Sequence, residues 1–467
     1  MNSASTLGTA PERTPTRRRL GDLVVLGVEA ALLTAAVLVG VLLNRRGVGL
    51  YADAAPLYAT WLPHVGWGTP AAVLVAAVVI GPGLRWARTA RWGALLAAAW
   101  LAAVAWTLSL ALVDGASAGL TQRMTPQAEY LSEVPGVSDI PAMLAGFSGR
   151  ILDFQPESWS THTAGHPPGA LLIFVWLDRV GLGGGTSAAL ACVLIGATVS
   201  VSVPVTLRAL GAADAARAVT PFLVLLPGAV WVGASADGIF AGVVAAGLAL
   251  LAVRGPVVAA VGGLLLGFAL YLSYGFVLVG LLALVVVVLR PTRRVGALLA
   301  ALAGVAGVVL AFTAAGFPWW VGYRLVVERY YQGWAAERPY AYWVWANLAA
   351  LLLAAGPVLG PALRRAVVTA AAAARSGLAG GRRGVRDRAA AIRGMGAAVL
   401  LPLAAGLAVV GADVSGLSKA EVERIWLPFT VWLLVAAALL PPRAHRWWLV
   451  GQAATALAVN HLLWTVS

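Results

Sequence analysis

The stretch THTAGHPPG (161–169) closes a polar loop that runs from Asp114 to Pro168 in a chain that is otherwise mostly apolar. The carboxylates that follow Asp114 in this loop are Glu129, Glu133, Asp139, Asp153 and Glu157. Two histidines, His162 and His166, stand near its end, and Pro167-Pro168 leads into the next apolar run. Because functional groups gather on loops that a rigid scaffold positions, we expect the chemistry in this loop and read the remaining chain as its scaffold.

The composition excludes an ordinary soluble protein. Hydrophobic residues make up 60% of the chain and charged residues 11%, and the mean hydropathy is +0.85. This balance predicts a polytopic membrane protein. The formal net charge of +14 comes from arginines in short clusters between apolar runs, which is typical of cytoplasmic loops and not of a nucleic-acid-binding surface. The single Cys192 lies in an apolar run, so neither a disulfide framework nor a thiolate metal site is expected. Usage rich in Ala, Gly and Arg but poor in Lys is typical of high-GC bacteria such as actinobacteria.

Long apolar runs without alternating polarity predict membrane-spanning helices and exclude a barrel. We therefore expect an all-α protein with thirteen spans, near residues 22–44, 69–85, 92–113, 187–207, 217–233, 236–253, 256–273, 275–290, 294–315, 344–361, 394–411, 426–441 and 446–466. No small-residue cleavage site follows the first run, so it is interpreted as a retained span and not as a signal peptide.

Arginine clusters orient these spans. Arg17, Arg18 and Arg19 place the amino terminus in the cytoplasm, and the later clusters belong on the same side: Arg85/Arg88/Arg91, Arg208/Arg217, Arg254, Arg290/Arg293/Arg294, the run from Arg364 to Arg393, and Arg443/Arg446. These placements agree only if the short apolar piece 168–182 is a juxtamembrane or re-entrant helix and not a crossing. The carboxyl terminus then lies outside. The run from Arg364 to Arg393 is expected to be a flexible cytoplasmic loop.

The orientation divides the chain into four parts. These are a basic cytoplasmic tail (1–21), the first three spans (22–113), an external acidic loop with juxtamembrane helices (114–182), and a ten-span scaffold (183–467). The external face collects 45–66, 114–168, Ser235–Asp237, Tyr271–Tyr274, 316–343 and 412–425. We expect the functional site on this face.

A carboxylate in the acidic loop is the candidate general base. Partial burial against lipid and aromatic rings raises the pKa of a carboxylate into a range that suits proton abstraction from a hydroxyl. Glu129, which lies close to a span and beside Tyr130, is the first candidate, and Asp139 and Glu133 are the alternatives. An ordinary solvated surface loop is the competing interpretation.

The two histidines are four residues apart, which would suit a metal pair on a helix. Gly165 and the prolines that follow argue against a helix, and no carboxylate is spaced beside them. We therefore predict no metal site. His166 is expected to contact a phosphate, to hydrogen-bond nearby, or to cap the following helix. Whether a divalent cation takes part is left open by the sequence.

External cations indicate an anionic ligand. Interfacial preference explains the tryptophans of 316–343, but not Arg324, Arg329 and Arg338 on the outer face. Together with Lys419 and Arg424 in 412–425, these arginines suit a phosphate, while rings such as Tyr330 suit stacking on a sugar. Local ion pairing is the alternative: Arg329 with a nearby Glu, and Lys419 and Arg424 with Glu421 and Glu423.

Asp237 stands at a predicted corner between two spans. Charged groups near membrane depth are costly and usually functional. Ser235 and Asp237 are also good helix N-cap residues. The sequence leaves both roles open. It contains no Walker lysine loop, no GxSxG elbow and no HExxH motif, so ATP hydrolysis and metalloprotease chemistry are not expected.

Several of these segments together resemble the GT-C superfamily of membrane glycosyltransferases, which includes protein mannosyltransferases, aminoarabinose transferases, and actinobacterial mannosyl- and arabinosyltransferases. The segments that carry the resemblance are Glu129-Tyr130, DIPAMLAGFSGRIL (139–152), GHPPGALLIFVWLDRVGLGG (165–184), the stretch from Pro221 to Asp237, and SKAEVERIWLPF (418–429). In that family an acidic motif and a Tyr precede juxtamembrane helices and a Pro-Pro-Leu element. Here the acid is single, and Gly169 replaces the Leu. If the first span were the counterpart of the family's first span, Asp53 in LYADAAPLY (50–58) would be the acid.

The resemblance implies an inverting glycosyltransferase in the cell envelope. It would move a sugar from a polyprenyl-phosphate donor in the membrane lipid to a glycan, lipid or protein acceptor on the outer face of the plasma membrane, without a cofactor. Glu129 would be the base, and the donor phosphate would lie against Arg329 and Arg424 near His166. His162, Lys419, Asp237 and Tyr330 would complete the donor site. The alternatives are a transporter or lipid flippase, which the nearly charge-free span centres disfavour, and a non-catalytic membrane subunit.

Overall fold

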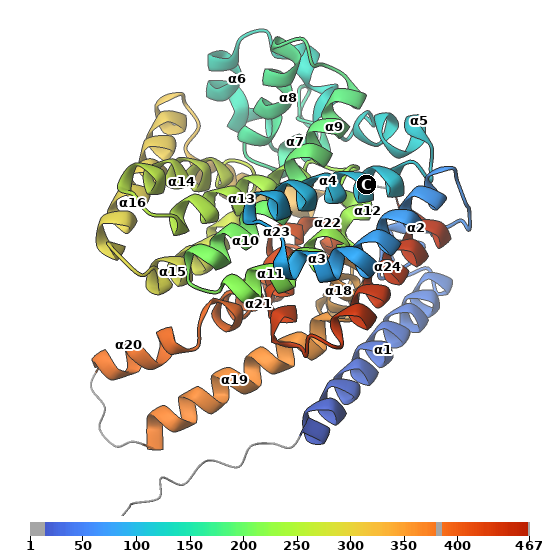
Figure 1. Ribbon diagram of the computed structural model, residues 1–467. Helices are drawn as coiled ribbons and strands as arrows, with labels where there is room; N and C mark the ends of the chain where they lie inside the picture. Colours follow the sequence, from blue (N-terminus) through green and yellow to red (C-terminus); the bar gives the residue numbers. More distant parts are fainter. Residues whose placement is uncertain (1–14, 380–384, 466–467) are drawn as a thin grey trace, which may run out of the picture.

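The computed structural model describes residues 15–379 and 385–465 of the chain, and apart from two short strands its regular elements are helices. In Figure 1 the polar loop forms a cap at one end of a bundle of helices. The start of α1, the end of α19 and the whole of α20 project from the opposite end. The first fourteen residues of the predicted basic tail and residues 380–384 of the predicted arginine-rich loop lie outside the described residues.

The first part of the chain holds the helices before the polar loop. They are α1 (Pro15–Arg45), the continuous series α2 (Gly68–Val78), η1 (Val79–Gly83) and α3 (Leu84–Thr89), and α4 (Trp92–Ala111), with the short strand β1 (Ala59–Trp61) between α1 and α2. The π-helical turn η1 contains Pro82, which lacks the N–H that a regular helix would use.

The polar loop folds into short helical turns. These are α5 (Ala116–Gly119), η2 (Thr121–Met124), η3 (Tyr130–Ser132), η4 (Val134–Gly136), α6 (Ile140–Gly146), η5 (Phe147–Arg150) and α7 (Thr161–Gly165). The apolar piece after Pro167-Pro168 forms α8 (Gly169–Arg179), an 11-residue helix. At about 1.5 Å per residue α8 is too short to cross a bilayer, as the sequence predicts.

The scaffold that follows begins with α9 (Gly185–Gly196) and α10 (Val199–Ala209), then α11 (Ala213–Val224), α12 (Ala229–Val232), α13 (Asp237–Ala252), α14 (Pro256–Ala269), η6 (Tyr274–Leu278), α15 (Val279–Leu289) and α16 (Arg294–Ala314). It continues with α17 (Trp319–Gln332), η7 (Trp334–Ala336), α18 (Tyr340–Ala355), α19 (Leu359–Ala379), α20 (Val385–Gly394) and α21 (Ala397–Val414), and ends with α22 (Val422–Ile425), α23 (Leu427–Leu433), η8 (Leu434–Leu439), α24 (His445–Leu462) and β2 (Leu463–Thr465).

The chain is an all-α, multi-pass membrane protein by the length and apolar character of its helices. Among the described residues, six helices are long and apolar enough to cross a membrane: Arg19–Arg45, Gly68–Thr89, Trp92–Ala111, Gly185–Ala209, Arg294–Ala314 and Ala397–Val414. The bent pair α18–α19 would make a seventh. The apolar runs at Asp237–Ala252, Pro256–Ala269, Tyr274–Leu289 and Leu427–Leu439 form shorter helices of 10–17 residues. The predicted number of thirteen spans is therefore not confirmed.

Two sequence predictions in the carboxyl-terminal half need correction. The apolar run predicted as one span over 344–361 bends by 104° between α18 and α19. Gly356 takes a φ of +86° there, which ends α18, and Pro357 follows it. The predicted flexible loop from Arg364 to Arg393 is helical over most of its described length. Its alternating Ala and Arg residues are both strong helix formers, so the segment continues as α19 and re-forms as α20.

Contacts gather the segments predicted to be external. Arg338 donates to the carbonyl of Leu50 over 3.2 Å, and the backbone N–H of Tyr58 donates to Glu423 over 3.2 Å. The indole of Trp319 donates to Leu270 over 2.8 Å. At the end of the chain, β2 pairs antiparallel with β1, with Ala59 opposite Thr465, so the last described residues also lie with this set. The loops that the arginine pattern assigned to one side thus meet one another.

The basic clusters likewise meet at a second set of contacts. Arg88 donates to the carbonyl of Pro442 over 3.1 Å, and Arg217 donates to Ala87 over 3.0 Å. Arg365 pairs with Asp22 at 2.6 Å, which joins α19 to the start of α1. These contacts bring together loops that are far apart in sequence, as expected if the arginine clusters share one face.

Helices α14 and α16 lie side by side with parallel directions and pack through glycines. A Cβ atom added at Gly263 would lie 2.1 Å from the carbonyl oxygen of Ala301, and one at Gly304 would lie 2.4 Å from that of Ala260. Without a hydrophobic driving force between helices in lipid, such close backbone approach is a main source of packing energy. The pair therefore depends on the absence of these side chains.

Replacing Gly304 by Ala should destabilise the protein, because the new methyl group collides with backbone that cannot yield freely. We expect a loss of about 1–3 kcal/mol, the usual cost of overpacking, seen as a lower thermal transition in detergent. Gly307→Ala on the same helix is the matched control, since a Cβ there meets nothing within 4 Å. That control should be neutral or slightly stabilising. Equal transitions for the two variants would show that the close packing is not needed.

Candidate active site

Arg424 lies at the centre of a buried charged network formed by segments that are distant in sequence. Its side chain, on the short helix α22, is 7% exposed. One terminal nitrogen donates to Asp237 over 3.0 Å, and the other donates to Glu421 over 2.5 Å. Burial alone would lower the pKa of Arg424, but the neighbouring Glu421 and Asp237 raise it, so the guanidinium keeps its charge.

His162 extends the network from Arg424 to Glu129. Its Nε2 lies 3.2 Å from a terminal nitrogen of Arg424, and its Nδ1 lies 2.7 Å from the carboxylate of Glu129. A guanidinium can only donate, so Nε2 of His162 accepts and the proton sits on Nδ1, which donates to Glu129. The side chain of Glu129 is 6% exposed. The candidate base is thus held by a histidine whose tautomer the arginine fixes.

Local structure explains how the polar loop presents these two groups. Glu129 is the extended residue immediately before η3, and His162 lies in the single helical turn α7. The backbone N–H of His162 donates to the carbonyl of Ala128 over 3.0 Å, which fixes α7 against the start of η3. The prediction that Gly165 and the prolines prevent a helix was wrong for one turn. The turn ends at His166, because a residue that precedes proline is driven to extended backbone.

Of the two roles that the sequence left open for Asp237, the structure shows the contact with the charged network and not the N-cap, since Ala236 is the N-cap residue of α13. Asp237 is the first residue of α13, and its backbone N–H donates to the Ser235 hydroxyl over 3.3 Å. The same hydroxyl lies 3.1 Å from the Asp237 carboxylate. Ser235 therefore helps to fix the start of the helix, while the Asp237 carboxylate faces Arg424. The pairing with Arg424 lets a carboxylate that is 6% exposed remain in an apolar setting.

Glu421 and Arg338 continue the network beyond Arg424. Arg338 lies 3.4 Å from Glu421 and also donates to the carbonyl of Lys419 over 2.8 Å. Although burial raises the pKa of Glu421, the positive charges of Arg424 and Arg338 outweigh it and lower that pKa to about 2. Glu421 thus neutralises Arg424, which is the local pairing that the sequence offered as an alternative to phosphate binding.

The loop that carries Glu421 is held in a strained backbone conformation. Ala420 and Glu421 have φ values of +70° and +61°, a region that side chains other than glycine rarely adopt. Asn347 stabilises this turn, since its amide accepts from the Ala420 N–H over 3.3 Å and donates to the Ser418 carbonyl over 2.6 Å. Strain of this kind persists only where surrounding contacts impose it, and it is common at functional sites.

Lys419 and Tyr330 lie beside this turn. The backbone N–H of Lys419 donates to the Tyr330 hydroxyl over 2.9 Å, and the Lys419 ammonium donates to the carbonyl of Ala335 over 2.8 Å. Burial raises the pKa of Tyr330 to about 12. Both sequence candidates are therefore near the network, but each is engaged in holding the loop in place.

Glu423 is a buried carboxylate that sequence analysis treated only as a counter-ion. One oxygen accepts from the backbone N–H of Tyr58, and the other has no hydrogen-bond partner among the described residues. Burial raises the pKa of Glu423 to about 7. Two residues away in the same motif, Glu421 is shifted in the opposite direction. The difference arises from the arginines beside Glu421, and the spacing in the sequence does not reveal it.

His166 lies next to the network, and its imidazole ring packs against the rings of Tyr130 and Phe240. Its Nδ1 donates to the carbonyl of His162 over 2.9 Å, and its ring is 5.8 Å from that of Tyr130 and 5.7 Å from that of Phe240. Burial lowers the pKa of His166, so its neutral form is favoured. Its Nε2 is left as a hydrogen-bond acceptor.

Other candidates are held elsewhere. Arg329 pairs with Asp153 and lowers the pKa of that carboxyl. Asp139 accepts from the Ala142 N–H over 2.9 Å and caps α6. Asp53 is exposed on the loop before β1, and Glu133 accepts from the Ser160 N–H over 2.6 Å. Glu129 is thus the only one of the four proposed bases that the described contacts join to Arg424 through a histidine.

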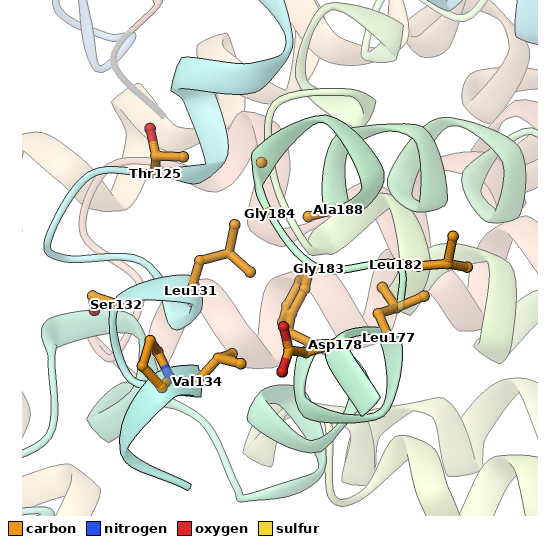
Figure 2. A pocket seen from close by; sticks show the side chains of 13 residues that line it. Thr125, Leu131, Ser132, Val134, Leu177, Asp178, Leu182, Gly183, Gly184 and Ala188 are labelled. Atoms are coloured by element: carbon orange, nitrogen blue, oxygen red, sulfur yellow. The ribbon is translucent and has the colours of Figure 1, made fainter. Parts of the chain in front are cut away.

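A hollow of about 290 Å³ lies behind Tyr130, whose ring stacks on Phe174 at 5.3 Å. Figure 2 shows the apolar side chains of Leu131, Val134, Leu177 and Leu182 around it, with the Asp178 carboxylate among them. A Cβ at Gly183 would lie 2.4 Å from that carboxylate. The hollow borders the aromatic stack and not the charged network.

Two further observations concern ligands. The Nε atom of Arg424 is buried and has no hydrogen-bond partner among the described residues, so it is a free donor at the centre of the network. No group of three or more His, Cys, Asp or Glu side chains in the described ranges could hold a metal ion. The comparisons with known proteins found no matching family model, no matching curated protein and no matching solved structure.

Replacing Arg424 by Met should destabilise the protein strongly, because Asp237 would remain buried without its cation and Glu421 would keep only Arg338. Breaking a buried pair in this way costs about 3–5 kcal/mol. The measurement is the thermal transition of the purified protein in detergent. Adding Asp237→Asn to this variant should restore part of the loss, since one orphaned charge is removed. Arg446→Met, at an exposed position of α24, is the control and should change little.

The stability of the protein should fall as the pH rises from about 4.5 to 7, because native Glu423 holds its proton more tightly than the unfolded chain does. At roughly 1.4 kcal/mol per pH unit the contribution is about 3 kcal/mol. Glu423→Gln, which keeps an oxygen for Tyr58, should remove this part of the slope. Glu421 acts in a separate window, since its stabilisation is lost only as the pH falls from 4.5 towards 2.

Thermal transitions measured across pH 4–8 for wild type and Glu423→Gln test this prediction. Glu157→Gln, at an exposed carboxylate of the polar loop, is the control and should leave the slope unchanged. Identical slopes for wild type and Glu423→Gln would show that Glu423 is ionised in the native protein at neutral pH.

Proposed function

We propose that the protein is an inverting membrane glycosyltransferase that takes its sugar from a polyprenyl-phosphate donor on the extracytoplasmic face of the plasma membrane. The observation that carries the proposal is the Glu129–His162–Arg424 chain. It places a buried, oriented carboxylate within two hydrogen bonds of a buried guanidinium. A base for an alcohol and a cation for a phosphate are the two groups that such a transfer requires.

In the proposed reaction Glu129 takes the proton of the acceptor hydroxyl. The acceptor oxygen forms a bond to the anomeric carbon from one side, while the bond from that carbon to the phosphate oxygen breaks on the other. The lipid phosphate leaves with the bonding electron pair. His162 acts as a positioning residue, because its Nδ1–H holds the Glu129 carboxylate in one orientation. The configuration at the anomeric carbon is inverted.

In the proposed reaction Arg424 would stabilise the negative charge of the departing phosphate. The unpartnered Nε of Arg424 is the donor best suited to it, since the other nitrogens already serve Asp237, Glu421 and His162. Neutral His166, with its free Nε2, would suit a hydroxyl of the sugar better than the phosphate. Arg329 would not take part while it is paired with Asp153. This assignment narrows the donor site to fewer residues than the sequence offered.

The proposal includes the finer architecture, a GT-C-like bundle in which the short apolar helices also cross the membrane to give thirteen spans. The contacts that gather the six external segments, and those that join the arginine clusters, support it. One alternation of crossings would account for both sets. A flippase or transporter, and a non-catalytic subunit, are the outcomes against which the proposal is tested.

Glu129→Gln should abolish transfer while donor binding persists, because the amide keeps the hydrogen bond with His162 but cannot take a proton. We expect turnover to fall by about 10²–10⁴-fold. The assay offers the purified protein a panel of radiolabelled polyprenyl-phosphate sugars and measures both transfer and slow donor hydrolysis. Asp139→Asn and Asp53→Asn are the controls and should keep activity, since an Asn still caps α6 and Asp53 is exposed.

If the Glu129→Gln variant were active and the Asp53→Asn variant inactive, Asp53 would be the base. The first span of this chain would then correspond to the first span of the GT-C family. Binding of no donor in the panel, with no turnover, would contradict the proposal and lead to flux assays in vesicles. Retained binding together with unchanged cell-envelope composition in a strain that carries Glu129→Gln would favour a non-catalytic subunit.

A further inference from the structure

A second polar feature lies at the other end of α14 and α16, away from the candidate active site. It is a hollow of about 520 Å³ between the end of α15 and the start of α16. Its lining consists of Pro256, Arg290, Pro291, Arg293, Arg294, Val295, Gly296 and Ala297. We name it the basic hollow.

The positive charge of the basic hollow is not compensated by the protein. Arg290, Arg293 and Arg294 make no ion pair within the described part of the chain, and the sequence holds no Asp or Glu between Asp237 and Glu328. Arg290 is 2% exposed and donates only to carbonyl oxygens, those of Leu251 and Thr292. Arg294 donates to the carbonyl of Arg290 over 2.6 Å. Carbonyl oxygens satisfy Arg290, but the three guanidinium groups together leave a local net positive charge that an anion supplied from outside would neutralise.

Backbone donors face the same space. No side chain caps the start of α16, and the first backbone hydrogen bond of this 21-residue helix is from Ala297 to Arg293. The N–H groups of residues 294–296 are therefore left for another acceptor. Because α14 lies parallel to α16, its own amino-terminal end, at Pro256, borders the hollow as well. The amino-terminal ends of α14 and α16 thus add to the positive potential of the arginines. The carboxyl-terminal end of α15 opposes them, and its carbonyl at Arg290 accepts from Arg294.

The depth of the basic hollow matches the far membrane interface. At about 1.5 Å per residue, α16 is about 31 Å long. Its other end reaches the polar loop, since a Cβ at Gly316 would lie 2.8 Å from Ala145 in α6. The hydrocarbon core of a bilayer is about 30 Å thick. The hollow therefore lies one membrane thickness from the polar loop, at the level of lipid headgroups in the opposite leaflet.

Apolar side chains beside the hollow suit the remainder of a lipid. Val257, Val295 and Leu299, in the first two turns of α14 and α16, are 74%, 69% and 61% exposed. A soluble anion would gain nothing from this surface, whereas the acyl chains of a phospholipid would cover it. Basic pockets between membrane helices are suited to anionic headgroups for this reason.

We propose that the basic hollow binds the phosphate of an anionic phospholipid in the leaflet opposite the candidate active site. The guanidinium groups of Arg293 and Arg294 and the free N–H groups of α16 hold the phosphate, and the exposed valines and leucine lie along the acyl chains. This site is separate from the proposed transfer reaction and does not depend on it.

The test measures lipid binding to the purified full-length protein by native mass spectrometry. Anionic phosphatidylglycerol is compared with zwitterionic phosphatidylcholine. We expect phosphatidylglycerol to bind preferentially, and Arg293→Gln/Arg294→Gln to weaken that binding about tenfold or more. Arg443→Gln/Arg446→Gln is the matched control, because it removes two exposed arginines that belong to the predicted cytoplasmic clusters but lie outside the hollow. Its binding should equal that of wild type.

Two further arms complete the test. Arg293→Lys/Arg294→Lys keeps the charge and the topology signal, so it should fold, insert and bind more tightly than the Gln pair. Inorganic phosphate is added as a competitor. If the hollow binds a lipid, inorganic phosphate should displace only a small part of the bound phosphatidylglycerol. Equal loss in both arginine pairs would show a general surface charge effect and overturn the proposal. Binding of phosphate without preference for phosphatidylglycerol would also overturn it, by showing a free-anion site.

Discussion

The burial of Arg424 is the constraint on which the polar end of the structure depends. A guanidinium removed from water is tolerated only where carboxylates and hydrogen-bond acceptors surround it. Asp237 at the start of α13, Glu421 in the strained turn before α22 and His162 in α7 supply them. Each comes from a different loop, so satisfying one side chain fixes the positions of three segments. The same contact brings Glu129 into the network through His162.

The charges around each carboxylate in this network give Glu421, Glu423 and Glu129 different roles. Glu421, beside two arginines, is held ionised, whereas burial raises the pKa of Glu423 to about 7. Glu129 is paired with His162, whose Nδ1–H orients the carboxylate through one of its two oxygens, Oε1. The same side chain thus serves as a counter-ion at Glu421, a buried acid at Glu423 and a candidate base at Glu129, because the surroundings of the three carboxyl groups differ.

Helices α14 and α16 separate the basic hollow from the end of the protein that carries the polar loop. The close packing of α14 on α16 through Gly263 and Gly304 forms a pair with parallel axes. Its amino-terminal ends border the basic hollow. At the opposite end, Leu270 after α14 accepts from Trp319 of α17, and Gly316 after α16 lies against Ala145 of the polar loop. The length of α16 is about one hydrocarbon thickness, so in a membrane the proposed architecture would place the two polar regions at opposite interfaces. The proposed lipid site and the proposed transfer reaction therefore occupy separate ends of one chain.

The sequence by itself determined the class of the protein and the side on which its polar groups gather. Apolar runs specify helices in lipid, and arginine clusters specify which loops belong together, since both effects are local and need no knowledge of packing. It also singled out Glu129, His162, Asp237 and Arg424 as candidates. Only the tertiary structure decided that these four touch, that Arg329 is engaged by Asp153, and that Asp139 merely caps a helix. It also decided the bend at Gly356 and the helical form of the arginine-rich segment. The physical reason is that pairing, burial and pKa depend on distances between segments far apart in the chain, and local composition does not contain those distances.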